Sequence, residues 1–180
     1  MIDPSLASEK KLILGVGLLS QNFSRVSGGV SGNPGLGTIY PEVHLSYDLF
    51  IGAGYSLSPW VLYTPMLRIS RDGGDTTNVL ALALRLKKDL SSSLSANLGV
   101  GEFIYRMYGP GGTTTLNNGN STATFALPSG SVASTLFTVN TGFGFAFSET
   151  WRTDLDMMVV NLFSAKRAFN AVLSVGYGIL

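Results

Sequence analysis

Apolar and polar residues alternate along most of this chain, in about eight separate segments. The clearest segment is 38–56, where every odd position from 43 to 55 is apolar or aromatic. The even positions from 42 to 56 are Glu, His, Ser, Asp, Phe, Gly, Gly and Ser, so Phe50 is the one exception. Successive side chains of a β-strand point to opposite faces, so one face of this strand meets an apolar environment and the other a polar one. The segment is long for a soluble strand and long enough for a tilted strand to cross a bilayer.

Turn-forming residues between the segments predict eight strands, at 10–23, 38–56, 60–71, 76–88, 93–108, 135–147, 151–163 and 168–180. A short turn is predicted at Leu57-Ser58-Pro59. In the fifth strand the apolar parity changes near Gly99-Val100-Gly101, which predicts a β-bulge. The remaining connections fall into two groups, short turns and outer loops at about 24–37, 72–75, 109–134 and 164–167. The segment 109–134 is rich in Gly, Thr, Asn and Ser, which predicts a mobile surface loop.

The composition indicates a membrane protein that crosses the bilayer with strands. The chain has 180 residues and is 45% hydrophobic, yet no run approaches the roughly 18 uncharged apolar residues of a membrane helix. A soluble β-sandwich or lipocalin-like barrel is the alternative, in which the apolar face points inward. The 12 basic and 11 acidic residues form no basic stripe, so we expect no nucleic-acid partner. The absence of cysteine excludes structural disulfides.

This pattern over residues 10–180 resembles the small eight-stranded outer-membrane barrels, typified by the membrane domain of outer membrane protein A and by outer membrane protein X. The resemblance rests on the strand pattern and on no catalytic motif. It implies an all-β, eight-stranded antiparallel up-and-down transmembrane barrel, with short periplasmic turns and longer outer loops, in the bacterial outer membrane. Residues 1–9 are then an N-terminal periplasmic segment and 10–180 one barrel domain. We expect contacts with outer-membrane lipid and lipopolysaccharide, and a monomer.

The two ends of the chain bear on export and assembly. The start Met1-Ile2-Asp3-Pro4 shows no charged n-region and no long apolar stretch, so we expect a mature sequence with an added start Met. Proteins of the resembled group usually end in an aromatic residue, whereas this chain ends Tyr177-Gly178-Ile179-Leu180. We therefore expect either a further native residue or a relaxed assembly signal.

If the apolar parity faces lipid, the other parity places a set of ionisable side chains in the lumen. The predicted lumen charge network is Glu42, His44, Asp48, Arg68, Arg85, Glu102, Arg106, Arg152, Asp154 and Asp156. An eight-stranded barrel is only wide enough for its own side chains, so these charges must pair. Folding the second and third strands about the Leu57–Pro59 turn predicts an ion pair between Asp48 and Arg68.

The position of each residue along its strand predicts whether it lies nearer the periplasmic or the outer end of the lumen. Four of them are expected toward the periplasmic end, namely Arg85, Arg152, Asp154 and Asp156. Another four are expected nearer the outer end, namely Glu42, His44, Glu102 and Arg106. A salt-bridged plug that closes the lumen is the favoured interpretation, and a narrow conductance gated by exchange of ion-pair partners is the alternative.

Aromatic residues at the strand ends are expected to mark the two membrane interfaces. The predicted interface aromatics are Tyr40, Tyr55, Trp60, Tyr105, Tyr108, Phe147, Trp151, Phe163, Phe169 and Tyr177.

An enzymatic role is the other hypothesis to weigh, because some barrels of this size modify lipid A with a His, a Ser and a carboxylate. Glu42, His44 and Ser46 share one strand face here, and a His oriented by an acid can activate a Ser hydroxyl. Residues two apart in a strand are well separated, and this face points into the lumen, so we expect no enzyme activity. No cofactor or metal is expected. The adjacent Asp154 and Asp156 face the same side as Arg152, which favours ion pairing over cation binding.

The favoured function is therefore non-enzymatic: a small outer-membrane barrel with a closed or very narrow lumen, structural or adhesive through its outer loops. The segment 109–134 is the best candidate for contact with an extracellular ligand. The alternatives are a minor pore for ions or small solutes and a lipid-A-modifying hydrolase that uses His44 and Ser46.

Overall fold

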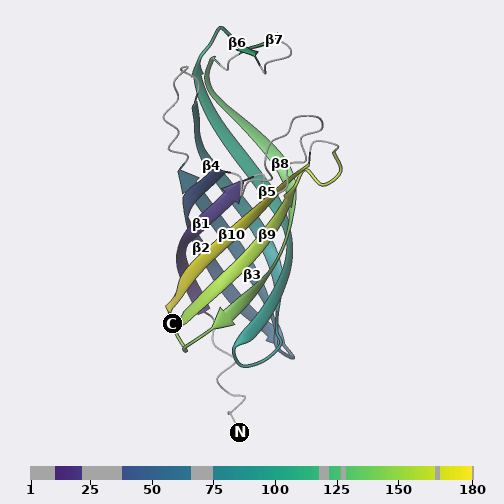
Figure 1. Cartoon of the computed structure of the whole chain (residues 1–180). Helices are drawn as coiled ribbons and strands as arrows, with labels where there is room; N and C mark the ends of the chain where they lie inside the picture. Colours follow the sequence, from purple (N-terminus) through teal and green to yellow (C-terminus); the bar gives the residue numbers. More distant parts are fainter. Residues whose placement is uncertain are drawn as a thin grey trace.

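The computed structural model of the chain is a closed antiparallel β-barrel, as Figure 1 shows. It describes residues 11–21, 38–65, 75–117, 122–126, 129–164 and 167–179. The strands of the wall are β1 (Lys11–Gln21), β2 (Thr38–Gly52), β3 (Tyr55–Pro65), β4 (Asp75–Asp89), β5 (Leu94–Pro110), β8 (Ser129–Ala146), β9 (Trp151–Val160) and β10 (Ala168–Ile179). Each of these wall strands pairs with the next wall strand along the chain, so that β5 pairs with β8, and β1 closes the barrel against β10. The predicted eight-stranded up-and-down barrel is confirmed.

The connections divide the barrel into two ends. Short turns join β2 to β3, β4 to β5 and β8 to β9 at the end where β1 begins and β10 finishes, which we call the turn end. The opposite end, which we call the loop end, carries the connections between β1 and β2, β3 and β4, β5 and β8, and β9 and β10. Among the described residues no helix has the length and apolar character needed to cross a membrane.

The turn predicted at Leu57–Pro59 is wrong, because the chain reverses at Ala53 and Gly54 instead. Both residues have positive φ, 52° and 74°, and β3 already begins at Tyr55. Pro59 lies inside β3 with its ring on the exposed outer face. The β2–β3 ladder is interrupted between the pairs Ser46–Trp60 and Leu49–Leu57. A proline has no backbone N–H to donate, which accounts for the gap at this point.

The predicted bulge in β5 is also wrong. The pairing of β5 with β8 runs without a shift from Leu94 to Pro110, and the only irregularity on its other side lies between Thr76 and Asn78 of β4. Because the strand keeps one parity throughout, the Phe103 side chain turns inward.

The segment 109–134, which was predicted to be a mobile surface loop, is mostly strand where the structure describes it. β5 continues to Pro110 and β8 starts at Ser129, and between them β6 (Thr113–Asn117) and β7 (Thr122–Ala126) form a separate two-stranded sheet. Threonine favours the strand conformation, and the exposed Thr115 and Thr124 hydroxyls lie 3.1 Å apart across the pair. We call residues 107–117, 122–126 and 129–135 the outer ribbon. It projects beyond the loop end of the barrel (Figure 1).

The two faces of the wall differ sharply in polarity. The outward residues form an apolar belt, in which side chains such as Val16, Leu98 and Phe143 are more than half exposed. The inward residues of the turn-end half are mainly charged, amide, hydroxyl or glycine, including Asp48 and Arg85. An apolar outer wall around charged interior groups is the arrangement of a transmembrane barrel, and it excludes the lipocalin-like alternative.

Candidate functional site: the barrel interior and the outer ribbon

Ion pairs fill the turn-end half of the lumen and tie strands together across it. Lys87 on β4 donates to Asp48 on β2 with an N–O distance of 2.6 Å, and Arg152 on β9 approaches the same Asp48 oxygen at 3.8 Å. Arg152 also holds Asp154 through two of its nitrogens. These carboxylates and cations are at most 16% exposed, so each charge needs the partner it has.

A second group of polar side chains lies against the first. Arg85 on β4 contacts Asp156 on β9 at 3.2 Å, and the Asn97 amide donates to the other Asp156 oxygen at 2.9 Å. Both aspartates that share a face on β9 are therefore held by arginines. Among the described residues no group of three His, Cys, Asp or Glu side chains converges as a metal site would require.

The predicted partner of Asp48, Arg68, lies outside the described residues. Among the described residues, Asp48 pairs with Lys87 and Arg152. The prediction depended on a turn at Leu57–Pro59; with the turn at Ala53 and Gly54, the register places Asp48 opposite Ser58. Lys87 was missed, although it shares the inward parity of Arg85 on the same strand, and that parity was the signal available in the sequence.

Glu42 and His44 form an isolated pair deeper in the lumen. Their side chains are 0% and 4% exposed, and His44 Nδ1 lies 3.2 Å from a Glu42 oxygen. The pair packs against two glycines of β1: a Cβ on Gly15 would overlap the His44 ring, and one on Gly17 would overlap the Leu173 carbonyl oxygen and the Glu42 carboxylate. The glycines therefore make room for the two larger side chains directly opposite them in the β1–β2 ladder.

This geometry places the candidate catalytic residues in the interior of the barrel. Glu42, His44 and Ser46 are all buried on the lumen face of β2. The Nε2 edge of the His44 ring lies against Gly15 of the neighbouring strand. A lipid in the membrane would have to enter the packed lumen to reach these side chains.

Trp60 is also inside the barrel, so its assignment to the membrane interface is wrong. Its exposed fraction is 2%. The Arg85 guanidinium lies 4.8 Å from the centre of the indole ring, and the His44 ring lies 6.2 Å away. The prediction took Trp60 as the first residue of a strand, whereas it is the sixth residue of β3, where inward parity buries it.

An apolar cluster, which the alternation of the strands did not predict, fills the lumen on the loop-end side of these charges. We call it the apolar plug. Its buried members are Leu19, Trp60, Leu62, Val79, Ala81, Phe103, Met158, Val160 and Val172. Tyr40 and Tyr105 pack against it, and the Phe103 and Tyr105 rings lie 4.9 Å apart. These two tyrosines, predicted at the interface, therefore face the lumen.

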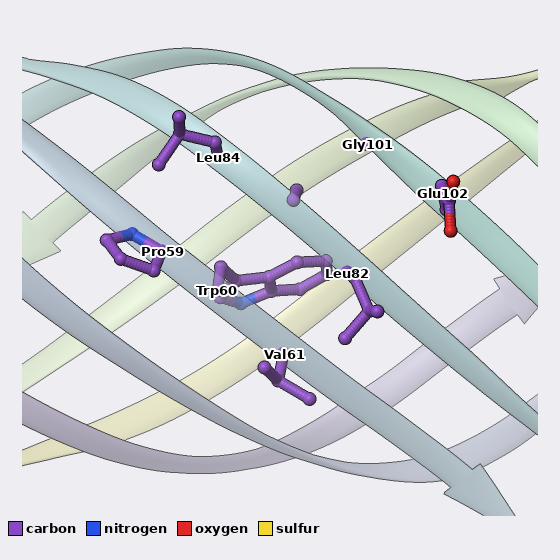
Figure 2. Close-up of a pocket in the computed structure, with 8 residues that line it drawn as sticks. Pro59, Trp60, Val61, Leu82, Leu84, Gly101 and Glu102 are labelled. Atoms are coloured by element: carbon purple, nitrogen blue, oxygen red, sulfur yellow. The ribbon is translucent and has the colours of Figure 1, made fainter.

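Glu102 and Arg106 face outward, contrary to the prediction that they line the lumen. Both are exposed, because β5 keeps its parity where the bulge was expected. Glu102 borders a mainly apolar pocket of about 380 Å³ formed by β3, β4 and β5, shown in Figure 2. The residues that line it are Pro59, Trp60, Val61, Leu82, Ala83, Leu84, Gly101 and Glu102.

The other predicted interface aromatics lie on the outer surface or at the ends of the wall. Near the turn end, Trp151 and Tyr177 are both exposed and meet edge to face at 5.0 Å. Tyr55 lies beneath the Lys88 ammonium at 3.7 Å. On the loop-end side, Phe163 stacks on Phe137 at 5.9 Å. The remaining three are Phe147 and Tyr108, both exposed, and the half-buried Phe169.

The outer ribbon carries no Asp, Glu, Lys, Arg or His. The whole stretch from Met107 to Ser148 lacks Asp, Glu, Lys, Arg and His. Any recognition by the ribbon itself therefore has to use backbone groups, hydroxyls, amides and apolar contacts.

Comparison with known proteins identifies the fold and little beyond it. Neither a protein-family model nor a curated protein sequence matches this chain. Among solved structures, Ail, the attachment invasion locus protein of Yersinia pestis in complex with the heparin analogue sucrose octasulfate, matches with a TM-score of 0.60 and 11% identity, over 95% of this chain and 99% of that one. The N-terminal β-barrel domain of Pseudomonas aeruginosa OprF matches with a TM-score of 0.51 and 11% identity, over 95% and 100% of the two chains. Neisserial surface protein A matches with a TM-score of 0.50 and 14% identity, over 94% and 96%. The chain has the fold of the small outer-membrane barrels.

Proposed function

We propose that this protein is a sealed outer-membrane barrel that acts through its outer ribbon as an attachment surface, without enzymatic activity. The observation that carries the proposal is the contrast between the two parts of the molecule. The lumen is packed with ion pairs and the apolar plug, while the ribbon extends both strands of the β5–β8 pair away from the membrane. The Ail match supports an attachment role only through the shared fold.

The apolar plug argues against the pore alternative. Hydrated ions do not cross a constriction that is lined and filled by apolar side chains, because no group there replaces their water. Leu62, Val79 and Phe103 are all 0% exposed and come from three neighbouring strands. The plug therefore closes the lumen independently of the ion pairs.

The hydrolase alternative requires lipid to reach His44, and the packing opposes this. The His44 ring lies between Gly15 and Trp60 and holds Glu42. A buried histidine held by a carboxylate and two neighbours is adequately explained as part of the interior packing.

The ribbon lacks the cationic side chains that a polyanion-binding surface needs. The Ail structure was solved with a heparin analogue, and highly charged anions are bound by clusters of Arg and Lys. Residues 107–148 provide no such cation. We therefore expect attachment through the ribbon to be insensitive to salt between about 50 and 500 mM.

The test compares the full protein with a variant in which residues 111–128 are replaced by Asn-Gly, a dipeptide suited to a tight hairpin. Both would be displayed on a non-adherent bacterium with an outer membrane, and the attachment of these cells to cultured epithelial cells would be counted. Slower gel migration after boiling checks that each barrel is folded. We expect the variant to fold and to lose attachment. Equal attachment by a folded variant would refute the proposal.

A further inference from the structure

Glu102 is an acidic side chain on the lipid-facing belt of the barrel. It is exposed and has the outward parity of β5. The ladders place Leu82 of β4 on one side of it and Phe137 of β8 on the other. Along its own strand, the nearest residues that face outward are Val100 and Ile104. Apolar side chains therefore flank this carboxylate on both neighbouring strands and along β5.

The apolar belt continues beyond Glu102 toward the loop end. Ile104 pairs with Leu80 of β4, and Leu80 pairs with Tyr63 of β3. Glu102 lies eight residues after Leu94, where β5 begins. At about 3.3 Å per residue and a tilt of about 40°, this is about 20 Å along the membrane normal, within an apolar belt about 25 Å tall. The carboxylate therefore lies inside the belt and not at its rim.

No described cation is in place to neutralise Glu102. A charged side chain that faces hydrocarbon is costly, and such residues usually mark a functional site. In the parts of the chain that the structure describes, Glu102 takes part in no ion pair. Arg106 shares its face of β5 but lies four residues further along, which is about 13 Å. The carboxylate is therefore placed to meet a cation from another molecule.

The pocket formed by β3, β4 and β5 lies directly beside this carboxylate. Pro59, Val61 and Leu84, which line it, are exposed and face outward, so the pocket opens on the lipid-facing side. In Figure 2, Glu102 lies at one end of the lining residues and Pro59 at the other. Its volume of about 380 Å³ falls within the range of small-molecule sites, about 300–1,000 Å³.

Small residues in the wall create this hollow. Ala83 and Gly101, which line it, have the inward parity of their strands and offer only a methyl group and a hydrogen atom. A Cβ on Gly101 would overlap the Leu82 carbonyl oxygen, so the close approach of β4 and β5 requires glycine at this point. The buried Trp60 indole also lines the pocket. The site therefore combines an apolar hollow with one carboxylate at its border.

We propose that this pocket and Glu102 form a binding site for a lipid-soluble amine. The ligand enters from the bilayer, places its apolar part in the pocket and its ammonium group on the Glu102 carboxylate. A neutral apolar ligand would leave the carboxylate without a partner, and a fatty acid would bring a second negative charge to it. Only a cation on an apolar body satisfies both halves of the site. The site does not depend on the outer ribbon or on the attachment role.

The fluorescence of Trp60 provides the test, because this residue lines the pocket. The chain has two tryptophans, so in a Trp151→Phe variant Trp60 is the only one. This protein is folded in vesicles of phosphatidylcholine, which carry no net charge. The probe is ω-bromoundecylamine, whose bromine quenches tryptophan, and ω-bromoundecanol is the matched neutral ligand. We expect saturable quenching by the amine at a concentration at least about tenfold lower than for the alcohol, because a hydrogen bond to a charged group is stronger than a neutral one.

Two substitutions separate the parts of the site. Glu102→Gln keeps the size of the side chain and removes its charge, so it should weaken amine binding at least about tenfold and leave alcohol binding unchanged. Val61→Phe fills the pocket from the lipid side and should also weaken amine binding. Its matched control is Val100→Phe, on the same outer wall but outside the pocket, which should bind the amine as the parent does. Slower gel migration after boiling checks that each barrel is folded.

Three results would overturn the proposal. Equal quenching by the amine and the alcohol, or unchanged amine binding by Glu102→Gln, would mean that the carboxylate has no part in binding. Quenching that never saturates would show partition into the bilayer without a site. Amine quenching that appears only at low ratios of protein to lipid would mean that a second copy of this chain covers the pocket. None of these results changes the expected outcome of the attachment assay, which depends on the outer ribbon.

Discussion

Truncation of Phe103 tests whether an apolar plug closes this barrel. Phe103 is 0% exposed and packs on Tyr105 inside the plug, whereas Phe143, on the outer wall of the same sheet, is 57% exposed. Replacing either ring by alanine loses a similar transfer free energy from water. Only the Phe103→Ala change leaves a space that lipid tails do not fill, because lipid surrounds the outer wall and not the plug.

The size of the difference follows from the cavity. A ring removed from a rigid interior leaves about 100 Å³, and at about 24 cal/mol per Å³ the unrelaxed cavity costs about 2 kcal/mol. We therefore expect Phe103→Ala to lower the free energy of unfolding by about 3–5 kcal/mol, and Phe143→Ala by about 2 kcal/mol less.

Urea unfolding in lipid vesicles, followed by the fluorescence of the two tryptophans, measures both losses. Heat-modifiability of each variant is the control for folding. Equal losses, or a greater loss for Phe143→Ala, would mean that Phe103 faces lipid and that the plug is not as described.

Three further predictions concern the polar half of the lumen. Asp48→Asn should cost about 1–3 kcal/mol in urea unfolding because Lys87 loses its charged partner, and the added change Lys87→Met should recover part of this loss; no recovery would contradict the pairing. Gly15→Ala should cost about 1–3 kcal/mol because its new Cβ would overlap the His44 ring, and His44→Ala in the same chain should remove most of that penalty; a neutral Gly15→Ala would show that the ring is free to move. Asp48→Ala should leave planar-bilayer conductance at the baseline of the parent protein, because the apolar plug is untouched; a clear rise would show that the ion pairs and not the plug close the lumen.

The wall of the barrel was predictable because it depends on parity alone. A run such as 43–55, apolar at every odd position, needs no knowledge of the neighbouring strand to show which face meets lipid. Even wrong strand ends leave this conclusion intact. β3 begins at Tyr55 instead of Trp60, and its outward residues are still apolar or aromatic; the lumen-facing Trp60 and Leu62 are the exceptions on its inner face, where polar residues were expected.

The interior was less predictable because it depends on register and on exceptions to parity. One misplaced turn was enough to change which residue of β3 lies opposite Asp48, and the parity of β4 alone did not show that Lys87 reaches it. The apparent parity change after Val100 has a different cause from the predicted bulge: the lumen itself becomes apolar there, so Phe103 is an inward apolar residue and Glu102 an outward polar one. If the lumen is assumed to be polar throughout, an inward apolar residue such as Phe103 is mistaken for a change in the direction of the side chains.

The same reasoning explains why the outer ribbon was taken for a loop. Beyond the membrane a strand no longer has one face in lipid, so the alternation that marks a wall strand disappears, as in the three consecutive threonines at 113–115. The pairing of β5 with β8 nevertheless continues into this region, because the hydrogen-bonded ladder does not depend on side-chain polarity. What changes is the number of paired strands. Among the described residues, β8 has a paired strand on each side inside the wall and on one side only above Thr138, so the pattern of a wall strand, with one face toward lipid and the other toward the lumen, no longer applies there.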